Sequence, residues 1–474
     1  MNILKSKIIS FFKEINALKK IDIILFVIIL VLLFFSFQHG DLIHTGNSSF
    51  ALLQGHFLDF YSYNKTLSET CSYLISTYIV FAIWNLPVLL FCNVDLNILE
   101  PGLLVFWYKL FTSILFFLAS LIIYKICKLI GLKKIHSKLV VILWLSCPIA
   151  LFSQFIFGQY DIITLILTLW GIYFLLQKKI MRFTILFSIA ITFKYFPVLI
   201  FFPLLFLLEK NLFKIIKYTI VLFIPVILEI IIFINSVAFR ENVMNFGVIE
   251  RIYNVGIAID GNNLFLNLFF LFWIFICGYT YFKKFENTSL FYYWVIYLPL
   301  LIFSVLFSFI FWHPQWLIIL TPFLVITTML QKRIEFFWFS EFLMMFFLVG
   351  FIVNNWANNV DAFLLNNGIG GYFKQIDHNN ILMQSFFIPN KPTLYFTFFI
   401  GTLLFTTFLK FPYNKSKINF QPENKISIIK YWNLVRLRFL GGILVFVIPA
   451  FLCYFLPERE VIKGHLLNFM QQIF

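Results

Sequence analysis

Residues 38–47 read QHGDLIHTGN, and they follow an apolar run at residues 21–37 that is long enough to cross a membrane as a helix. Residues 48–61 then carry apolar side chains at helical spacing, with Asn47 or Ser48 as the N-cap. We expect a short amphipathic helix there, lying in the membrane–water interface. Asp41 and two histidines would then lie next to lipid headgroups; a plain solvated loop is the alternative.

The composition indicates the class of protein. Of 474 residues, 61% are hydrophobic and 12% are charged, whereas a soluble domain carries about 25% charged residues. The six cysteines are scattered, without the spacing of a disulfide framework or a metal site. The net charge of +15 comes from lysines and arginines that gather in alternate connections, which marks cytoplasmic loops and not a nucleic-acid surface. The sequence therefore predicts an all-α polytopic membrane protein with no nucleic-acid partner.

Further apolar segments recur along the chain, at residues 73–93, 103–124, 139–157, 160–176, 183–194, 196–208, 218–236, 263–282, 290–312, 316–330, 334–353, 393–411 and 439–456. We expect about 13 crossing helices with one or more re-entrant segments, because a full span needs about 20 residues and several runs are shorter. The basic loops require that either 73–93 or 103–124 does not cross. Asn85 and Pro87 interrupt the first of these runs, which favours a re-entrant hairpin there.

The sidedness follows from the basic residues. Residues 1–20 form a basic amphipathic pattern, which predicts a helix on the cytoplasmic surface. With the N-terminus inside, the Asp41 stretch is external. The same rule puts five other connections outside, at residues 158–161, 194–197, 237–262, 313–316 and 354–392.

Two of these external connections carry polar residues next to apolar runs, where we expect the side chains to lie inside the protein. Asp161 opens an apolar run, where the helix dipole favours a carboxylate, and Gln159 precedes it. The run that ends at Lys194 has 12 residues and spans only about 18 Å. Lys194 is therefore expected to lie at depth, where a lysine needs an anionic partner.

Four other residues are candidates for contacts with a substrate. His313 and Gln315 lie at a helix junction that could equally be an aromatic-belt turn. Arg240 and Arg251 lie in one external connection, and the planar fork of arginine suits a lipid phosphate. The alternative for these arginines is a surface ion pair with Glu241 or Glu250.

Together these stretches resemble a known family. FGQYDIITL at residues 157–165 and FKYFP at residues 193–197 are similar to the Gly-Gln-x-Asp and Lys-x-x-Pro pair of glycosyltransferase family 87 and related mannosyltransferase-like proteins, and PQW at 314–316 is similar to a later element of that family. The proteins of this family belong to the GT-C class of glycosyltransferases, which use polyprenyl-phosphate sugars. The resemblance covers residues 20–330. In the first external stretch, the tyrosine common in the class a few residues after the Asp is missing.

The resemblance implies a GT-C-type multi-helix bundle with three parts: a cytoplasmic helix at 1–20, a catalytic transmembrane module at 21–330, and a variable region at 331–474 with the external loop 354–392. It implies a hexosyltransferase of the inverting type, in the cell envelope at a bacterial plasma membrane. Its partners would be membrane lipid, a polyprenyl-phosphate sugar donor, and a glycan, lipid or protein acceptor.

The resemblance also implies roles for the residues. Asp41 would be the general base, and Lys194, Arg240 and Arg251 would contact phosphate. The sugar or structural contacts would be Gln159, Asp161, His313 and Gln315. No metal-ligand cluster is evident, although Asp41 and Asp161 could share a divalent cation.

Two other classes remain open. A polysaccharide polymerase or ligase would use the 354–392 loop, with Asp361, Lys374, Asp377 and His378. A flippase for a lipid-linked sugar would show internal repeats, and the sequence shows none.

Overall fold

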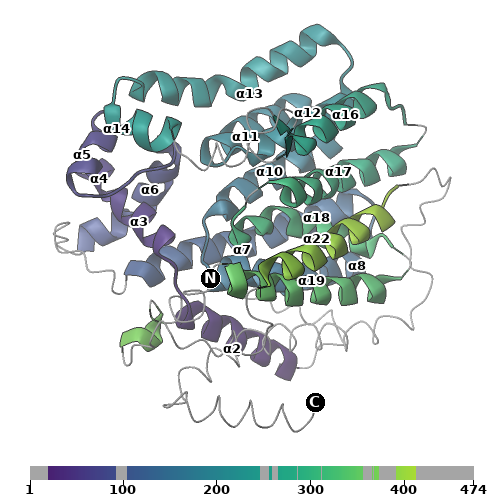
Figure 1. The fold of residues 1–474 in the computed structure, drawn as a ribbon, viewed down its shortest axis with the longest axis horizontal. Coiled ribbons are helices and arrows are strands. Elements are labelled where there is room, and N and C mark those ends of the chain that lie inside the picture. The colour runs from purple at the N-terminus through teal and green to yellow at the C-terminus, as the bar shows by residue number, and fades with distance from the viewer. Residues whose placement is uncertain are drawn as a thin grey trace.

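The computed structural model describes residues 20–91, 104–245, 256–258, 265–285, 287–310, 312–331, 333–355, 366, 368–372 and 391–412. This part of the chain is almost entirely helical, as the composition predicts (Figure 1). Its strands are two-residue segments, β1 (Ile257–Ala258) and β2 (Phe265–Leu266), which pair antiparallel. Residues 1–19 of the predicted N-terminal helix, most of the 354–392 loop, and the run at 439–456 lie outside the described residues.

The first half of the chain holds α2 (Lys20–Ser36), α3 (Gly40–Ser48), α4 (Phe50–Leu53), α5 (Phe60–Thr66), α6 (Ile75–Phe91), α7 (Leu104–Leu129), α8 (Lys134–Leu145), α9 (Pro148–Leu151), the π-helix η2 (Phe152–Ile156), α10 (Asp161–Leu176), α11 (Ile180–Phe193), α12 (Phe196–Leu208) and α13 (Leu212–Phe233). After it come α14 (Val237–Phe239), the π-helix η3 (Arg240–Met244), α16 (Leu268–Phe282), α17 (Thr288–Phe309), the 3-10 helix η4 (Pro314–Leu320), α18 (Thr321–Met329), α19 (Ile334–Asn355), the 3-10 helix η5 (Ile369–Tyr372) and α22 (Pro392–Leu409).

The helices have the length and composition of a membrane protein. Within the described residues, five are long and apolar enough to cross a membrane, or up to seven if each of two bent pairs is one span. Six further apolar helices have 10–17 residues, and the longest of these reaches only about 25 Å against a hydrocarbon core of about 30 Å. The described chain thus confirms a multi-helix membrane protein but not the expected number of about 13 crossings.

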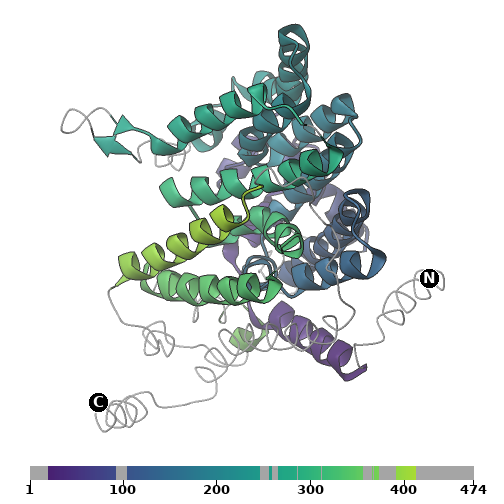
Figure 2. The same ribbon diagram turned by 90° about the vertical axis from the view of Figure 1, so that its right-hand side faces the viewer.

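The core is built from helix pairs packed through small and aromatic side chains. α10 and α11 form a close hairpin, because Gly171 leaves room for Phe187: a Cβ at Gly171 would meet that ring at 2.6 Å. α17 is the most enclosed of the five helices that are long enough to cross a membrane, with 94% of its most apolar stretch buried. α17, α22 and α19 lie side by side in both views (Figures 1 and 2).

Two local predictions are wrong. Residues 48–61 do not form one helix, because Gly55 adopts a φ of +94° and separates α4 from α5. In one continuous helix Phe57 would lie on the same face as Phe50, seven residues before it; Phe50 is buried, but Phe57 is 42% exposed. The run at 73–93 is not a hairpin, since α6 continues through Pro87 to its end at residue 91. A proline costs a helix one hydrogen bond but does not always end it.

Candidate active site

The stretch that carries Asp41 is the first turn of a helix and not a loop. α2 ends at residue 36, and the chain turns by 71° into α3. His39 is the N-cap of α3, and its Nδ1 accepts the backbone N–H of Asp41 at 3.2 Å. The His39 ring packs on Phe157 at 4.4 Å between centroids. Burial lowers the pKa of His39, which agrees with an Nδ1 that accepts a hydrogen and bears none. The Asp41 carboxylate, 3.6 Å from this Nδ1 and 45% exposed, is open to an incoming group.

α3 is held by side-chain hydrogen bonds to several other parts of the chain, and these fix the position of the helix that carries Asp41. The side chain of Asn85 on α6 donates to the Gly46 carbonyl at 3.1 Å, and Tyr108 on α7 donates its O–H to Asn47 at 2.8 Å. On the exposed side, His44 Nδ1 lies 2.8 Å from the Glu69 carboxylate, and this hydrogen bond raises the pKa of His44. α3 is therefore held by its capping residue, by two helices and by the connection before α6.

Gly46→Ala is expected to disturb the packing of α3 against α7. A Cβ at Gly46 would lie 2.5 Å from the ring of Tyr108, which is fully buried. Overpacking of this kind costs about 1–3 kcal/mol, and the contact between α3 and α7 must open to relieve it. We expect a lower melting temperature in detergent and faster amide exchange in α3. The matched control is Gly278→Ala on α16, where a Cβ meets nothing within 4 Å; equal effects of the two changes would contradict this packing.

The second part of the site is a buried ion pair. Gly158 adopts a φ of +75°, a conformation that favours glycine, and the chain then enters α10 at Asp161 as predicted. Lys194 follows the last residue of α11, and its Nζ lies 3.4 Å from Asp161 Oδ1. The predicted anionic partner of the deep lysine is thus present. Neither oxygen of Asp161 has a hydrogen bond among the described residues, although its side chain is fully buried.

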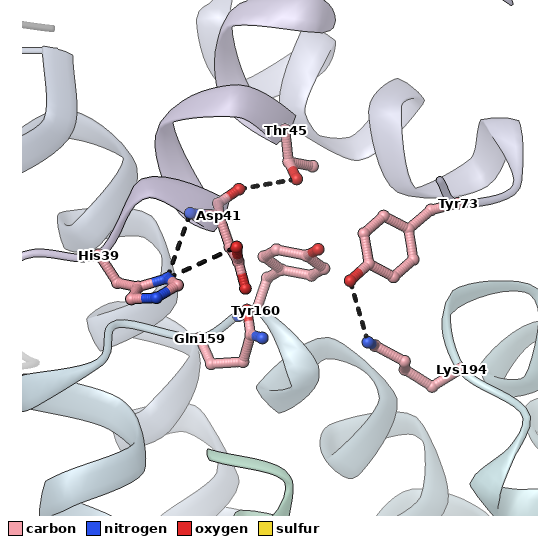
Figure 3. A network of polar contacts seen from close by, with 7 residues as sticks. All are labelled: His39, Asp41, Thr45, Tyr73, Gln159, Tyr160 and Lys194. Carbon is pink, nitrogen blue, oxygen red and sulfur yellow. Dashed lines mark hydrogen bonds and ion pairs between the residues drawn. The ribbon is translucent and has the colours of Figure 1, made fainter. Parts of the chain in front are cut away.

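Aromatic rings frame Lys194 and connect it to Asp41. The ammonium lies 4.5 Å from the ring centroid of Tyr73, 5.8 Å from Tyr160 and 5.6 Å from Trp316, within the range of cation–π attraction. It also donates to the Tyr73 hydroxyl at 3.3 Å. Figure 3 shows the Tyr160 ring between Asp41 and the Tyr73–Lys194 contact. The network joins the N-terminal stretch to the two motifs at 157–165 and 193–197.

Three other predicted residues, His313, Gln315 and Gln159, lie close in the chain to residues of this network. His313 is the N-cap residue of η4, and its ring lies 5.1 Å from that of Trp316, which borders Lys194. Gln315 is buried, and its Oε1 has no hydrogen bond in the described part of the chain. Gln159 is also buried, and its Oε1 accepts the backbone N–H of Tyr160. The helix junction therefore supports the lysine through Trp316.

Arg240 is engaged elsewhere. Its side chain is exposed and donates to the Ile234 carbonyl at 2.7 Å. Among the described residues, it forms no hydrogen bond or ion pair with Lys194 or Asp41. Glu241, the predicted alternative partner of an external arginine, instead pairs with Lys65 at 2.6 Å. Arg251 lies outside the described residues.

Several residues of the site carry no signal in the sequence. Tyr73 lies just before α6, outside every motif, and reaches Lys194 only through the fold. Tyr160 lies inside the 157–165 motif but reads as an ordinary aromatic residue. His39 caps α3, a helix that the sequence pattern did not predict, and Asn47 and Ser48, the predicted N-caps of a helix at 48–61, lie inside α3. Across the described residues, no group of three or more His, Cys, Asp and Glu side chains is placed to hold a metal ion. A cation shared by Asp41 and Asp161 stays a prediction.

Comparison with known proteins supports the resemblance seen in the motifs. Residues 86–246 match glycosyltransferase family 87. No curated protein and no solved structure matches the chain. The matched part contains Gln159, Asp161 and Lys194, while Asp41 and His313 lie on either side of it. The chain is thus a multi-helix membrane protein whose residues 86–246 match the model of glycosyltransferase family 87.

Proposed function

We propose that this protein transfers a sugar from a polyprenyl-phosphate donor to a hydroxyl group of an acceptor on the outer face of the membrane. The observation that carries the proposal is that a partly exposed Asp41 and Lys194, the partner of the buried Asp161, lie on either side of the Tyr160 ring (Figure 3). A carboxylate that can take a proton and a cation that can stabilise a leaving phosphate are the two groups that such a transfer requires.

Asp41 would act as the general base. The acceptor oxygen attacks the anomeric carbon, and its proton passes to the Asp41 carboxylate. The bond from that carbon to the phosphate oxygen breaks, and the electron pair leaves with polyprenyl phosphate. A single displacement of this kind inverts the anomeric carbon. The backbone hydrogen bond to His39 and the fastening of α3 fix the carboxylate in place.

Lys194 would bind the donor phosphate. An ammonium group has three hydrogens to donate; in this structure one is directed to Tyr73, and another faces Asp161. The third is available for a phosphate oxygen. Asp161 stabilises the charged form of the lysine, and the surrounding rings of Tyr73 and Trp316 offer the apolar faces on which sugar rings commonly stack.

The proposed orientation of the chain in the membrane gives a direct prediction. Single cysteines at Leu58, which is 77% exposed near α5, and at Lys134, which begins α8, are placed in a protein that lacks the native cysteines. An impermeant thiol reagent added to intact cells is expected to label position 58 at once and position 134 only after the membrane is opened, because basic loops stay in the cytoplasm. Labelling of position 134 in intact cells would overturn the proposed orientation.

The test of the donor class uses the purified protein. It is incubated with a panel of radiolabelled hexoses carried either on polyprenyl phosphate or on a nucleoside diphosphate, together with a crude membrane extract as the source of acceptor. Transfer from a polyprenyl-phosphate sugar is the expected result. Transfer from a nucleotide sugar alone would refute the proposed donor, and it would also remove the need for a deep cation near a lipid phosphate.

A further inference from the structure

Lys109 is a fully buried lysine in the middle of an apolar helix. It lies on α7, and its side chain has no exposed surface. In the described part of the chain no carboxylate forms an ion pair with it. A charged group at such a position is costly, and it is kept where it pairs with other groups or serves a function.

Its partners are the carbonyl groups at the end of α2. The Lys109 ammonium donates to the carbonyl oxygens of Leu33, Phe34 and Phe37, at 3.1, 2.7 and 2.5 Å. The last carbonyls of a helix have no partner within the helix, and they carry the negative end of its dipole. A lysine from another helix thus caps the C-terminus of α2 at the point where the chain turns by 71°.

Tyr108, the residue before Lys109, binds the helix that follows the same bend. Tyr108 donates to Asn47 near the end of α3, so two consecutive residues of α7 bind the helices before and after the bend. The side-chain methylenes of Lys109 also lie close to the 157–165 motif: a Cβ added at Gly158 would lie 3.7 Å from Lys109 Cγ and 3.4 Å from a methyl group of Leu42 on α3. Lys109 therefore lies where α2, α3 and the turn that leads to Asp161 meet.

We propose that Lys109 is a positioning residue: by capping α2 it fixes the bend that holds His39 and Asp41 against the 157–161 turn. The proposal rests on the proposed function for its catalytic consequence, but the structural part stands without it. Among the described residues, Lys109 forms no hydrogen bond or ion pair with Asp41, Asp161 or Lys194, so it acts through the backbone of residues 33–37.

The experiment compares Lys109→Met and Lys109→Gln with a matched control, Lys125→Met. Lys125 lies on the same helix, is exposed, and rests on the ring of Trp170. The first readout is amide exchange in detergent. Residues 37–48 are expected to exchange faster in Lys109→Met, while the α10–α11 hairpin is unchanged. Lys109→Gln keeps a hydrogen-bond donor and should show an intermediate rate, and Lys125→Met should match the wild type.

The second readout is the kinetics of transfer. A catalytic group that is misplaced by about 1 Å costs about 10²-fold in rate, so kcat of Lys109→Met should fall by about that factor while KM for the donor stays close to the wild-type value. Lys109→Gln should recover part of kcat. A role confined to stability would instead lower the amount of folded protein and leave kcat per folded molecule unchanged.

The outcomes separate the two proposals. Unchanged exchange at residues 37–48 in both Lys109 variants would overturn the positioning role, whatever the activity. Faster exchange with a normal kcat would overturn its catalytic consequence. If Lys109→Met does not fold, Lys109→Gln decides by the same two readouts. Failure of the proposed function would appear in the wild type, as absence of transfer from every polyprenyl-phosphate sugar, and would leave the exchange result standing.

Discussion

Asp41→Asn is expected to lower the rate of sugar transfer by about 10²–10⁴-fold, because asparagine keeps the shape of the side chain but cannot take up the proton of the acceptor hydroxyl. The protein should still insert and still bind the lipid donor, since Asp41 makes its capping contact through the backbone N–H, which asparagine retains. The measurement is transfer of radiolabelled sugar from the donor lipid, with donor binding measured separately.

Asp59→Asn is the matched control. Asp59 also lies in the connection between α2 and α6, but its carboxylate is exposed and pairs with His56 at 2.9 Å, ahead of α5. Its replacement should change transfer little. Near-normal transfer by Asp41→Asn, or a loss that occurs only with Asp59→Asn, would remove Asp41 from the role of the base.

Lys194→Met is expected to abolish donor binding, and it should also destabilise the protein. The change leaves the Asp161 carboxylate buried without its cation, and breaking a buried pair in this way costs about 3–5 kcal/mol. The double variant Lys194→Met/Asp161→Asn removes both charges, so it should regain much of the thermal stability. It should not regain donor affinity, because the phosphate still lacks its cation.

This comparison separates a phosphate contact from a structural ion pair. Melting temperature and binding of radiolabelled donor lipid are measured for both single variants and for the double variant. If donor affinity returns together with stability in the double variant, Lys194 serves the fold alone, and the phosphate must be bound by another group.

The sequence predicts those parts of the site in which a charged residue lies next to an apolar run, because such a residue needs a partner. Lys194 follows a run too short to cross the membrane, so its burial and its need for an anion could be foreseen, and Asp161 is that anion. The start of α10 at Asp161 also follows from the sequence, because a carboxylate suits the N-terminus of a helix.

The geometry around Asp41 could not be predicted in the same way. The start of α3 depends on a cap from His39 and on the capping of α2 by Lys109, which is more than 70 residues away in the chain. Helical spacing alone cannot detect such contacts. The same spacing suggested a continuous helix over residues 48–61, where the positive φ of Gly55 in fact ends the regular structure. Tyr73 and Tyr160 join the site only because α6 and α10 pack near α3.

The most direct test of the account follows both products in sealed vesicles that contain the purified protein, a radiolabelled polyprenyl-phosphate sugar and an acceptor extract. The account predicts that polyprenyl phosphate is released in equal amount to the sugar that reaches the acceptor, and that Asp41→Asn releases neither. Movement of the intact donor lipid to the opposite leaflet, without release of polyprenyl phosphate, would contradict it and would identify a transporter of the lipid-linked sugar.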